Sequence, residues 1–361
     1  MAPPGLDTFR VVRFKLTLEA KERLVLPPYK GTVLRGGFGH VLRKVGCIAR
    51  RGECPPCLLK GTCPYAYIFE TPPPPTSQVL RKYPHAPHPF ILEPPFDRTT
   101  TYEPGTSLTF GLVLVGKAID YLPYFVYAFE ELGRIGLGRG KGKYRLVQVA
   151  LIRDPDQIVS IYDGRTSLLT APTDLATPVP PNCSVIASEA KQSLVAPSTI
   201  TLRFLSPTRL TYNGHPEGPG EFHVLFRNLL RRINLLNYFH CGGLLLDNAR
   251  TMIESARAIE TVEACVRWHA WERYSNRQGQ RVPMGGFTGQ VTYCGDFTFL
   301  WPWVRLGASI HVGKAATFGL GQYRVVTLPE DYTPGPRQRT QRSGIRETIT
   351  VPGAGEEWCG V

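Results

Sequence analysis

Residues 319–326 read GLGQYRVV, and residues 140–147 of the same chain read GKGKYRLV. In each segment a glycine-rich turn leads directly into a strand-like run that begins with tyrosine and arginine. Glycine lets backbone N–H groups come close to a partner, and successive N–H groups in such a turn form a concave anion site. Two such turns, one in each half of the chain, predict a duplicated module that binds a polyanion.

The overall composition points to the same class of ligand. The 361 residues carry 42 Lys and Arg against 29 Asp and Glu, a formal charge of +13, and 11% of them are aromatic. Such a chain suits a phosphate backbone and stacked bases. No apolar run approaches the ~20 residues that a membrane-spanning helix needs, and the N-terminus lacks a signal-peptide core. We therefore expect a cytoplasmic nucleic-acid-binding protein with no membrane partner.

Hydrophobic periodicity divides the chain into two similar halves, domains at 1–153 and 199–330. In the first half it predicts strands at 9–18, 108–115 and 144–152 and helices at 31–45 and 121–132. In the second half it predicts strands at 199–205, 266–274, 287–293 and 323–326 and helices at 221–240 and 297–306. Strand–helix–strand–strand–helix–strand is the ferredoxin-like order. The predicted fold class is α+β, with two tandem ferredoxin-like domains.

Two further segments are predicted to lie outside these domains. Residues 154–198 are rich in Pro, Thr and Ser and are predicted to form a linker or insertion. Within it, residues 182–197 (NCSVIASEAKQSLVAP) resemble a translated mobile repeat element, which a surface insertion would tolerate. Residues 331–361 are rich in Pro, Gly and Arg and are expected to be a disordered tail.

Cys47, Cys54, Cys57 and Cys63 follow the spacing C-x6-C-x2-C-x5-C within a loop at 46–65. Four thiolates in one short loop can close a tetrahedral site around zinc, and they can also hold an iron–sulfur cluster. Spacing does not separate the two, although zinc is slightly favoured. A closed four-cysteine site has no open position for a substrate, so its predicted role is structural. The five other cysteines are interpreted as small hydrophobic residues.

His40 is the first candidate for chemistry. It lies on the predicted helix 31–45, and Arg43 and Lys44 follow on neighbouring positions of the same helix surface. Histidine is the side chain most often used as a general base, and adjacent cations can hold a phosphate and stabilise charge on it. Tyr29, just before the helix, could orient the base or the nucleophile. The alternative is a helix histidine that only packs, and from the residues alone that alternative is favoured.

Other cationic residues accompany the glycine-rich turns. His311 precedes the second turn and either contacts RNA or fixes the loop through its backbone. The residues expected to bind RNA are Arg35, Arg43, Arg139, Lys141, Lys143, Arg227, Arg231, His311, Gly313, Lys314, Thr317, Gly319 and Gly321.

Several enzyme classes are disfavoured by motifs that the sequence lacks. It has no carboxylate pair with metal-binding spacing, which argues against a two-metal nuclease. It also lacks GxSxG and Walker-type patterns, which argues against a serine hydrolase and a P-loop NTPase.

Four stretches carry a resemblance to a known family: GHVLR at 39–43, CPYAYIFET at 63–71, GFTGQVTYCGDF at 286–297 and HVGKAATFGLGQYRV at 311–325. They resemble the CRISPR-associated endoribonuclease that processes precursor CRISPR RNA, a member of the RAMP superfamily. The resemblance spans about 9–152 and 199–327. It implies tandem ferredoxin-like domains and a C-terminal glycine-rich loop, and the cysteine loop marks a subset of the family.

The resemblance also implies an activity and a partner. The family cuts each repeat of the CRISPR precursor RNA without a metal ion, by attack of a 2′-hydroxyl on the adjacent phosphate. The products are a 2′,3′-cyclic phosphate and a 5′-hydroxyl. By position, His40 matches the base, with Lys44 as a cation and Tyr29 as a third member. The family's glycine-rich loop holds the RNA backbone, and other CRISPR-associated subunits are possible partners.

Two rival functions remain open at this point. One is a non-catalytic RNA-binding RAMP subunit of a CRISPR interference complex, which would keep the basic loops but lack the base. The other is a metal- or redox-sensing protein built on the four cysteines.

Overall fold

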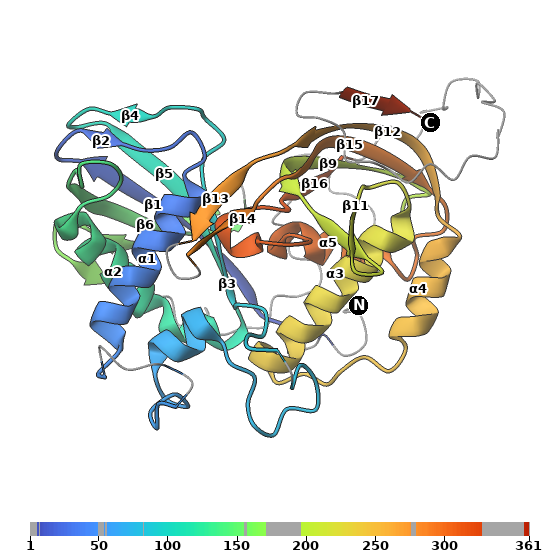
Figure 1. The fold of residues 1–361 in the computed structure, drawn as a ribbon, viewed down its shortest axis with the longest axis horizontal. Coiled ribbons are helices and arrows are strands. Elements are labelled where there is room, and N and C mark those ends of the chain that lie inside the picture. Colours follow the sequence, from blue (N-terminus) through green and yellow to red (C-terminus); the bar gives the residue numbers. More distant parts are fainter. Residues whose placement is uncertain are drawn as a thin grey trace. The chain divides into compact units, whose positions relative to one another are not determined.

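The computed structural model describes residues 6, 8–49, 54, 56–81, 83–154, 157–170, 196–275, 279–326 and 357–360. It divides into two compact units (Figure 1). Unit 1 comprises Met1–Gln192, Arg232–Leu246 and Ala316–Gly319, and unit 2 comprises Ser193–Arg231, Asp247–Ala315 and Leu320–Val361. Two segments from the second half of the chain therefore belong to the unit built by the first half.

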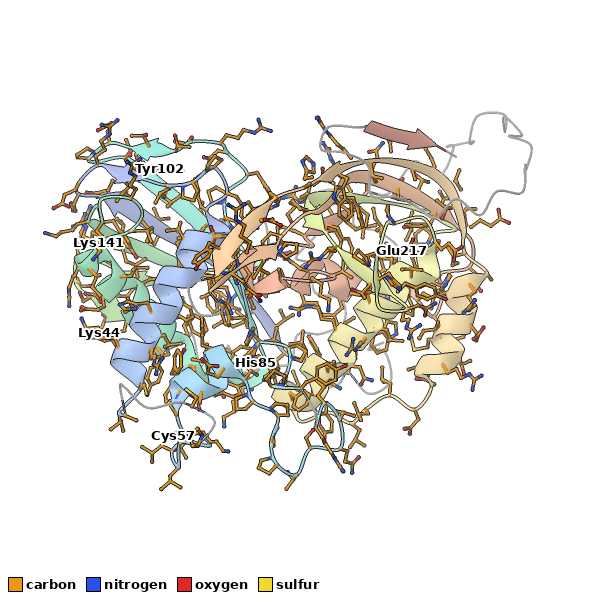
Figure 2. All side chains as sticks on the ribbon, viewed as in Figure 1. Lys44, Cys57, His85, Tyr102, Lys141 and Glu217 are labelled. Atoms are coloured by element: carbon orange, nitrogen blue, oxygen red, sulfur yellow. The ribbon has the colours of Figure 1, made fainter. Side chains whose placement is uncertain are left out.

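Unit 1 contains a six-stranded antiparallel sheet in the order β3-β5-β1-β6-β7-β8. Helices α1 and α2 cover one face of it (Figure 1). The short strands β2 and β4 form a separate ribbon, on which Figure 2 labels Tyr102. The elements are β1 Val11–Ala20, β2 Leu24–Val25, α1 Gly31–Gly46, the π-helical turn η1 Ala66–Glu70, β3 Phe90–Glu93, β4 Thr101–Tyr102, β5 Ser107–Val115, η2 Gly116–Tyr121, α2 Leu122–Ile135, β6 Tyr144–Asp154, β7 Gln157–Asp163, β8 Leu168–Leu169, η4 Asn237–Cys241 and η5 Ala316–Phe318.

Unit 2 contains a five-stranded sheet in the order β16-β9-β15-β12-β17 and two small ribbons, β10-β11 and β13-β14. Helices α3 and α5 lie on one side of the sheet (Figure 1). The elements are β9 Thr199–Thr208, β10 Leu210–Tyr212, β11 His215–Glu217, α3 Phe222–Leu236, whose last residues belong to unit 1, α4 Ala249–Arg257, β12 Glu260–His269, β13 Glu272–Ser275, β14 Gln280–Pro283, β15 Gly286–Cys294, α5 Trp301–Ile310, β16 Tyr323–Val326 and β17 Glu357–Gly360.

Both sheets have the strand arrangement of the ferredoxin-like fold. In unit 1 the four core strands follow the chain as β1, β3, β5 and β6, and they lie side by side as β6-β1-β5-β3. In unit 2 the corresponding strands β9, β12, β15 and β16 lie side by side as β16-β9-β15-β12. In both sheets the first core strand therefore lies between the fourth and the third, and the second core strand lies next to the third. The prediction of two tandem ferredoxin-like domains is confirmed.

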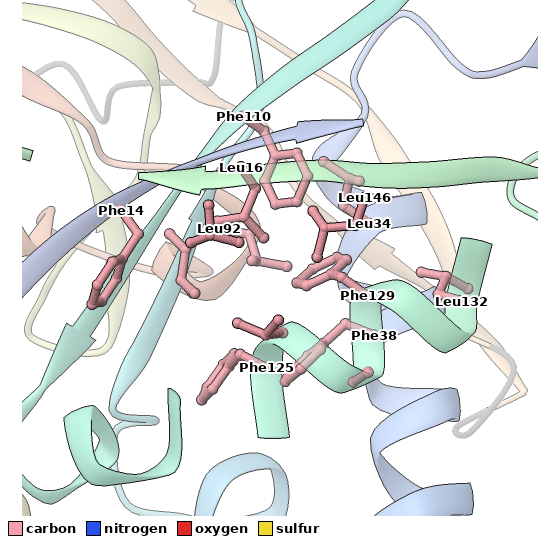
Figure 3. Close-up of a cluster of buried hydrophobic side chains, with 14 of the residues drawn as sticks. Phe14, Leu16, Leu34, Phe38, Leu92, Phe110, Phe125, Phe129, Leu132 and Leu146 are labelled. Carbon is pink, nitrogen blue, oxygen red and sulfur yellow. The ribbon is translucent and has the colours of Figure 1, made fainter. Parts of the chain in front are cut away.

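An aromatic stack in the core of unit 1 holds α1 against α2 and the sheet (Figure 3). The Phe38 ring on α1 stacks on Phe125 and Phe129 of α2, with centroids 4.8 and 5.3 Å apart. It meets Phe90 of β3 edge-on at 5.4 Å. Aromatic pairs of this kind stabilise a core by roughly 0.5–1.5 kcal/mol each beyond the area they bury. This stack fixes the rotation of α1 about its own axis.

The repeated sequence motif has the same structural role in both units. Tyr144 and Tyr323, at matching positions of the two copies, are buried at the start of the fourth strand of each sheet. The Tyr144 hydroxyl donates to the Phe129 carbonyl of α2 at 2.7 Å, and the Tyr323 hydroxyl donates to the Val304 carbonyl of α5 at 2.6 Å. Each tyrosine thereby links the fourth core strand of its unit, β6 or β16, to a helix, α2 or α5.

The backbone around the motif repeats as well. The Leu137 N–H donates to the Gly142 carbonyl, and the Val312 N–H donates to the Gly321 carbonyl, both at 2.9 Å. One residue further on, the Lys143 carbonyl accepts from the N–H groups of Lys21 and Glu22, just beyond the end of β1. The Gln322 carbonyl accepts from the N–H groups of Leu205 and Ser206, in the second half of β9. The two copies therefore share these backbone hydrogen bonds, although their turns differ: φ is positive at Lys141 in the first copy and at Gly321 in the second.

Several elements differ from the sequence prediction. Residues 157–169, assigned to a linker, instead add β7 and β8 to the edge of the unit 1 sheet. Residues 357–360, assigned to a disordered tail, form β17 against β12. Strand β3, helix α4 and the β13-β14 ribbon were not predicted; β3 is short and lies close to prolines on both sides, which hides its pattern. The mobile-element resemblance at 182–197 falls outside the described residues, apart from 196–197.

Within the described part of the chain, every helix is too short or too polar to cross a bilayer.

Removing either tyrosine hydroxyl tests the structural equivalence of the two copies. Tyr144→Phe and Tyr323→Phe should each lower the free energy of unfolding by ~1 kcal/mol, because each removes one buried hydrogen bond while keeping the ring. Tyr127→Phe is the matched control, since that ring lies on α2 and is 49% exposed. Chemical denaturation monitored by circular dichroism gives the three values. A loss at only one of the two tyrosines would contradict the equivalence.

Candidate nucleic-acid interface

Three residues of α1 form one exposed line along the helix: Gly36, His40 and Lys44. They are four residues apart, so they share a face. Lys44 is paired with Glu131 of α2, with Nζ and Oε1 3.3 Å apart, and Figure 2 labels it near the C-terminal end of α1. Of the three candidate catalytic residues, His40 and Lys44 are thus accessible on one surface.

The backbone of α1 is open at one point of this line. A side chain added at Gly36 would meet nothing within 4 Å, whereas one added at Gly39 would overlap the Phe69 ring at 2.2 Å. Gly39 is therefore required for packing, and Gly36 is not. Because glycine has no side chain, Gly36 leaves a bare patch of helix backbone one turn before His40. This patch has a stability cost, since glycine in a helix interior is less favourable than alanine by roughly 0.5–1 kcal/mol.

Arg35 connects this helix to the glycine-rich loop. Its guanidinium lies between the rings of Phe69 and Phe318, 4.4 and 4.5 Å from their centroids. Its Nε donates to Thr317 Oγ1 at 3.0 Å. The two rings thus hold the guanidinium in place through cation–π contacts. Arg35 and Thr317, both predicted to bind RNA, are brought together within unit 1 although 282 positions separate them in the sequence.

Tyr29 occupies a different place from His40. Its hydroxyl donates to the Phe318 carbonyl at 2.6 Å, and burial raises its pKa far above the ordinary value. It precedes α1, so about ten residues of helix, on the order of 15 Å, separate it from His40. The structure does not bring Tyr29 into a triad with His40 and Lys44. It places the tyrosine as a tether for the glycine-rich loop.

The glycine-rich loop is packed rather than open. The N–H groups of Lys314, Gly319 and Gly321 donate to the carbonyls of Arg209, Ala316 and Pro207. Side chains at Gly319 or Gly321 would collide with Leu92 and Pro94 or with Val312. These three amides are already used inside the protein, so the expectation that they cradle an anion is corrected. Among the predicted loop residues, Lys314 is exposed and Thr317 is buried.

His311 fixes the loop from inside. It is fully buried, and its Nδ1 donates to the Leu320 carbonyl at 3.0 Å. It ends α5 with φ 62° and ψ 164°, a conformation that favours glycine. The matching residue at the end of α2 is Gly136, with φ 98° and ψ 153°. Of the two roles considered for His311, its side chain takes the structural one and does not reach a surface ligand.

The first glycine-rich turn presents its cations to solvent. Arg139, Lys141 and Lys143 are all exposed, and Figure 2 shows Lys141 at the edge of unit 1. Lys143 is paired with Glu22, with Nζ and Oε1 3.4 Å apart. In unit 2, Arg227 and Arg231 are exposed on successive turns of α3. All five remain candidates for phosphate contacts.

The four clustered cysteines lie at the far end of α1. Cys47, Cys54 and Cys63 pack against the core of unit 1, and burial raises the pKa of the Cys54 thiol. Figure 2 labels Cys57 on the loop beyond them. Within the residues that the structure describes, no group of three or more Cys, His, Asp or Glu side chains is arranged to hold a metal ion. As placed, the four thiols do not form a coordination shell, and the metal stays a prediction that elemental analysis can test.

Comparisons with known proteins match this architecture. The chain is 25% identical, over 311 residues, to an uncharacterized protein of Archaeoglobus fulgidus, covering 83% of this chain and 92% of that protein. A Cas6 product complex from Thermus thermophilus superposes with a TM-score of 0.52 at 17% identity, covering 88% of this chain and 99% of the other. A chain of a partial Cas6-RT-Cas1–Cas2 complex gives 0.51 at 13% identity, covering 90% and 47%. These structural likenesses establish the fold.

Two family models match separate parts of the sequence. Residues 9–174 match AF_1859_N, described as an N-terminal domain. Residues 202–323 match the CRISPR-associated endoribonuclease Cas6. The second match covers most of the C-terminal ferredoxin-like sheet and the glycine-rich loop. The likeness to the CRISPR-associated endoribonuclease Cas6 therefore lies in residues 202–323.

Proposed function

We propose that this protein cuts the repeat RNA of CRISPR precursor transcripts without a catalytic metal, with His40 as the general base. The observation that carries the proposal is the exposed line on α1, where an accessible imidazole stands between a bare backbone patch at Gly36 and the Lys44 ammonium. RNA supplies its own nucleophile, so a base, a cation and correct positioning suffice.

In the proposed step, His40 takes the proton from a ribose 2′-hydroxyl. The 2′-oxygen forms a bond to the adjacent phosphorus, and the bond from phosphorus to the 5′-oxygen breaks. The 5′-oxygen takes up a proton as it leaves. The products are a 2′,3′-cyclic phosphate and a 5′-hydroxyl, with no change in oxidation state. The close approach of ribose to helix backbone that this requires is possible at Gly36, where an added side chain would have empty space around it.

Lys44 supplies the positive charge beside the phosphate in this proposal. Its pairing with Glu131 is solvent-exposed on the lysine side, and such surface pairs contribute about 0–1 kcal/mol. The ammonium can therefore turn from the carboxylate to a phosphate at little cost. Arg43, one position earlier, is partly buried and lies 5.8 Å from the Tyr65 ring centroid, so we assign it a supporting electrostatic role.

Tyr29 and His311 act as positioning residues in the proposed mechanism. Tyr29 holds the Phe318 carbonyl and His311 holds the Leu320 carbonyl, so the two side chains brace successive parts of the same loop. That loop in turn holds Arg35 through Thr317. The position of the loop is thereby fixed relative to α1, because Arg35 and His40 lie on one helix.

The proposed partner is CRISPR repeat RNA. The family description names an endoribonuclease, and one similar structure is a product complex. Another is a chain of a partial Cas6-RT-Cas1–Cas2 complex, and we extend to this chain only the proposal that further CRISPR-associated subunits bind it. A non-catalytic RNA-binding subunit is the rival function, and the experiment below separates the two.

His40→Ala should abolish cleavage of a labelled repeat RNA in EDTA while RNA affinity stays within about threefold of wild type. The loss should reach 10²-fold or more, because a general base contributes on the order of 10²–10⁴ to the rate. Mapping of the wild-type products should find 2′,3′-cyclic phosphate and 5′-hydroxyl ends.

His215→Ala is the control for this experiment, since His215 is exposed on the β10-β11 ribbon of unit 2. Its cleavage rate should match wild type. Cleavage by His40→Ala at the same site and rate would rule out His40 as the base. Binding without cleavage by the wild-type protein would favour the non-catalytic subunit.

Gly36→Ala and Gly36→Leu test the bare backbone patch. Both should stabilise the fold, alanine by roughly 0.5–1 kcal/mol, because α1 gains a better helix former and nothing lies within reach of the new side chain. Cleavage efficiency should fall progressively from glycine to alanine to leucine as the side chain blocks the approach of ribose. Denaturation curves and kcat/KM are measured on the same preparations. Full activity in Gly36→Leu would contradict the proposed approach over Gly36.

A further inference from the structure

Two exposed arginines lie opposite each other on the sheet of unit 2, on the face turned away from helices α3 and α5 (Figure 1). The strand register pairs Arg324 of β16 with Arg203 of β9. The neighbouring pair, Tyr323 and Phe204, faces the helices, because the Tyr323 hydroxyl donates to the Val304 carbonyl of α5. Successive residues of a strand point to opposite faces, so Arg203 and Arg324, here named the arginine pair, share the other face.

The arginine pair is not neutralised by an acidic side chain. Within the described part of the chain, neither guanidinium takes part in an ion pair or a side-chain hydrogen bond. Directly opposed residues of antiparallel strands have Cβ atoms about 4.5–5.5 Å apart, and like charges in that arrangement destabilise the sheet. On its other side Arg203 is opposite Gln290 of β15, which is exposed and uncharged. Two positive charges therefore lie side by side without compensation.

Unit 1 has the same position with its charge balanced. Arg145 and Arg324 both come directly after the tyrosine of the repeated motif. Arg145 lies opposite Glu19 of β1, and its Nη2 is 3.0 Å from Glu19 Oε2. Glu19 and Arg203 therefore occupy equivalent positions of the two units. Because the fold accepts an acidic residue at this position in unit 1, the packing of the sheet does not by itself require an arginine in unit 2.

Glu263 shares this face of the sheet but is too distant to neutralise the arginine pair. It lies on β12 opposite Thr292 of β15, two residues along from Gln290 and two strands away from Arg203. Strand spacing and rise per residue place Glu263 about 12 Å from Arg203. The Debye length is ~10 Å at 0.1 M salt, so exposed charges at that separation are largely screened from each other.

We propose that the arginine pair binds the phosphate backbone of RNA on unit 2, in addition to the contacts made by the exposed line of α1 in unit 1. Guanidinium groups are planar donors that match phosphate oxygens, and the Gln290 amide lies next to Arg203. A bound phosphate also removes the repulsion within the pair. The identification of RNA as the ligand rests on the proposed function, whereas the phosphate chemistry rests on the pair itself.

A nucleic acid suits the arginine pair better than an acidic protein segment does. The chain carries a formal charge of +13, and a nucleic acid presents a negative charge at every nucleotide along its strand. One phosphate can accept from both guanidinium groups through separate oxygens. The carboxylate that this position accommodates is supplied within the chain in unit 1, by Glu19, and is replaced by a second cation in unit 2.

The first test measures binding of a labelled repeat RNA that is methylated at every 2′-oxygen and therefore lacks the nucleophile. Arg203→Gln and Arg324→Gln should each weaken binding about tenfold, equivalent to ~1.4 kcal/mol. The slope of log affinity against log salt should fall by about 0.7 in each variant, the value for one lost contact with a single strand. Filter binding over a series of salt concentrations gives both quantities.

Arg203→Glu separates a binding role from a structural one. It places a carboxylate opposite Arg324, as Glu19 lies opposite Arg145 in unit 1. The midpoint of unfolding in denaturant should rise, because an opposite-charge pair replaces a like-charge pair. RNA affinity should nevertheless fall further than in Arg203→Gln, and the salt slope should fall by about 1.4, because both phosphate contacts are lost. A purely structural role predicts no loss of affinity in a stabilised protein.

Arg145→Gln is the matched control, since it removes the corresponding arginine of unit 1, which Glu19 already neutralises. Its RNA affinity and salt slope should equal those of wild type. Folded Arg203→Glu protein that keeps wild-type affinity and salt slope would overturn the proposal. An equal loss of affinity in Arg145→Gln and Arg324→Gln would also overturn it, because the loss would then reflect only the total charge of the protein.

Inorganic polyphosphate tests the phosphate chemistry of the pair without ribose or bases. It should raise the thermal unfolding midpoint of the wild-type protein more than that of Arg203→Glu, because only the wild type keeps both guanidinium groups open. Equal rises in the two proteins would reject the phosphate site.

Failure of the arginine pair can be distinguished from failure of the proposed function. Cleavage by the wild type and its loss in His40→Ala report on the proposed function, whereas the difference between wild type and Arg203→Glu reports on the pair. If repeat RNA is neither bound nor cut but polyphosphate distinguishes these two proteins, the proposed function fails and the phosphate site stands. If RNA is cut and Arg203→Glu binds it as the wild type does, the proposed function stands and the phosphate site fails.

Discussion

Burial of Phe38 is the constraint from which the candidate site follows. Its ring stacks between α1 and α2 and meets β3 edge-on. Each residue advances about 100° around a helix, so His40, two positions later, faces roughly away from Phe38. A rotation of α1 that exposed His40 less would have to withdraw Phe38 from the stack. The accessible imidazole is therefore a consequence of core packing, and it sits on a rigid element.

The duplicated motif contributes to packing within each unit. In both copies a buried tyrosine binds a helix carbonyl, and a glycine lets two backbone segments approach. The loop amides that the sequence offered for an anion are paired with protein carbonyls. In the proposed function, the positive charge for RNA would come instead from side chains around the loop, among them Arg35 and Lys314. Duplication thus explains the fold, and the functional surface is specific to each unit.

Much of the fold could be predicted because its main elements have strong local patterns. Strand β1, helix α2 and helix α3 alternate or repeat with the period of their structure, and the sequence locates them within a few residues. Strand β3 was not predicted because its 4 residues, which lie close to prolines, are too few to show a periodic hydrophobic pattern. Strands β7 and β8 were not predicted because the residues around them are rich in turn formers. Their stability comes from strand pairing, of β7 with β6 and of β8 with β7. That pairing has no local signature.

The sequence by itself determined the two ferredoxin-like repeats and the surplus of positive charge, and it placed His40 and Lys44 on one helix face, since each of these depends on residues close in the chain. Only the tertiary structure decided that Tyr29 serves the glycine-rich loop, that His311 is buried, and that Arg35 meets Thr317 across 282 positions. Local periodicity fixes the direction of a side chain, but its partner depends on which distant segment packs against it, and packing is a property of the whole core.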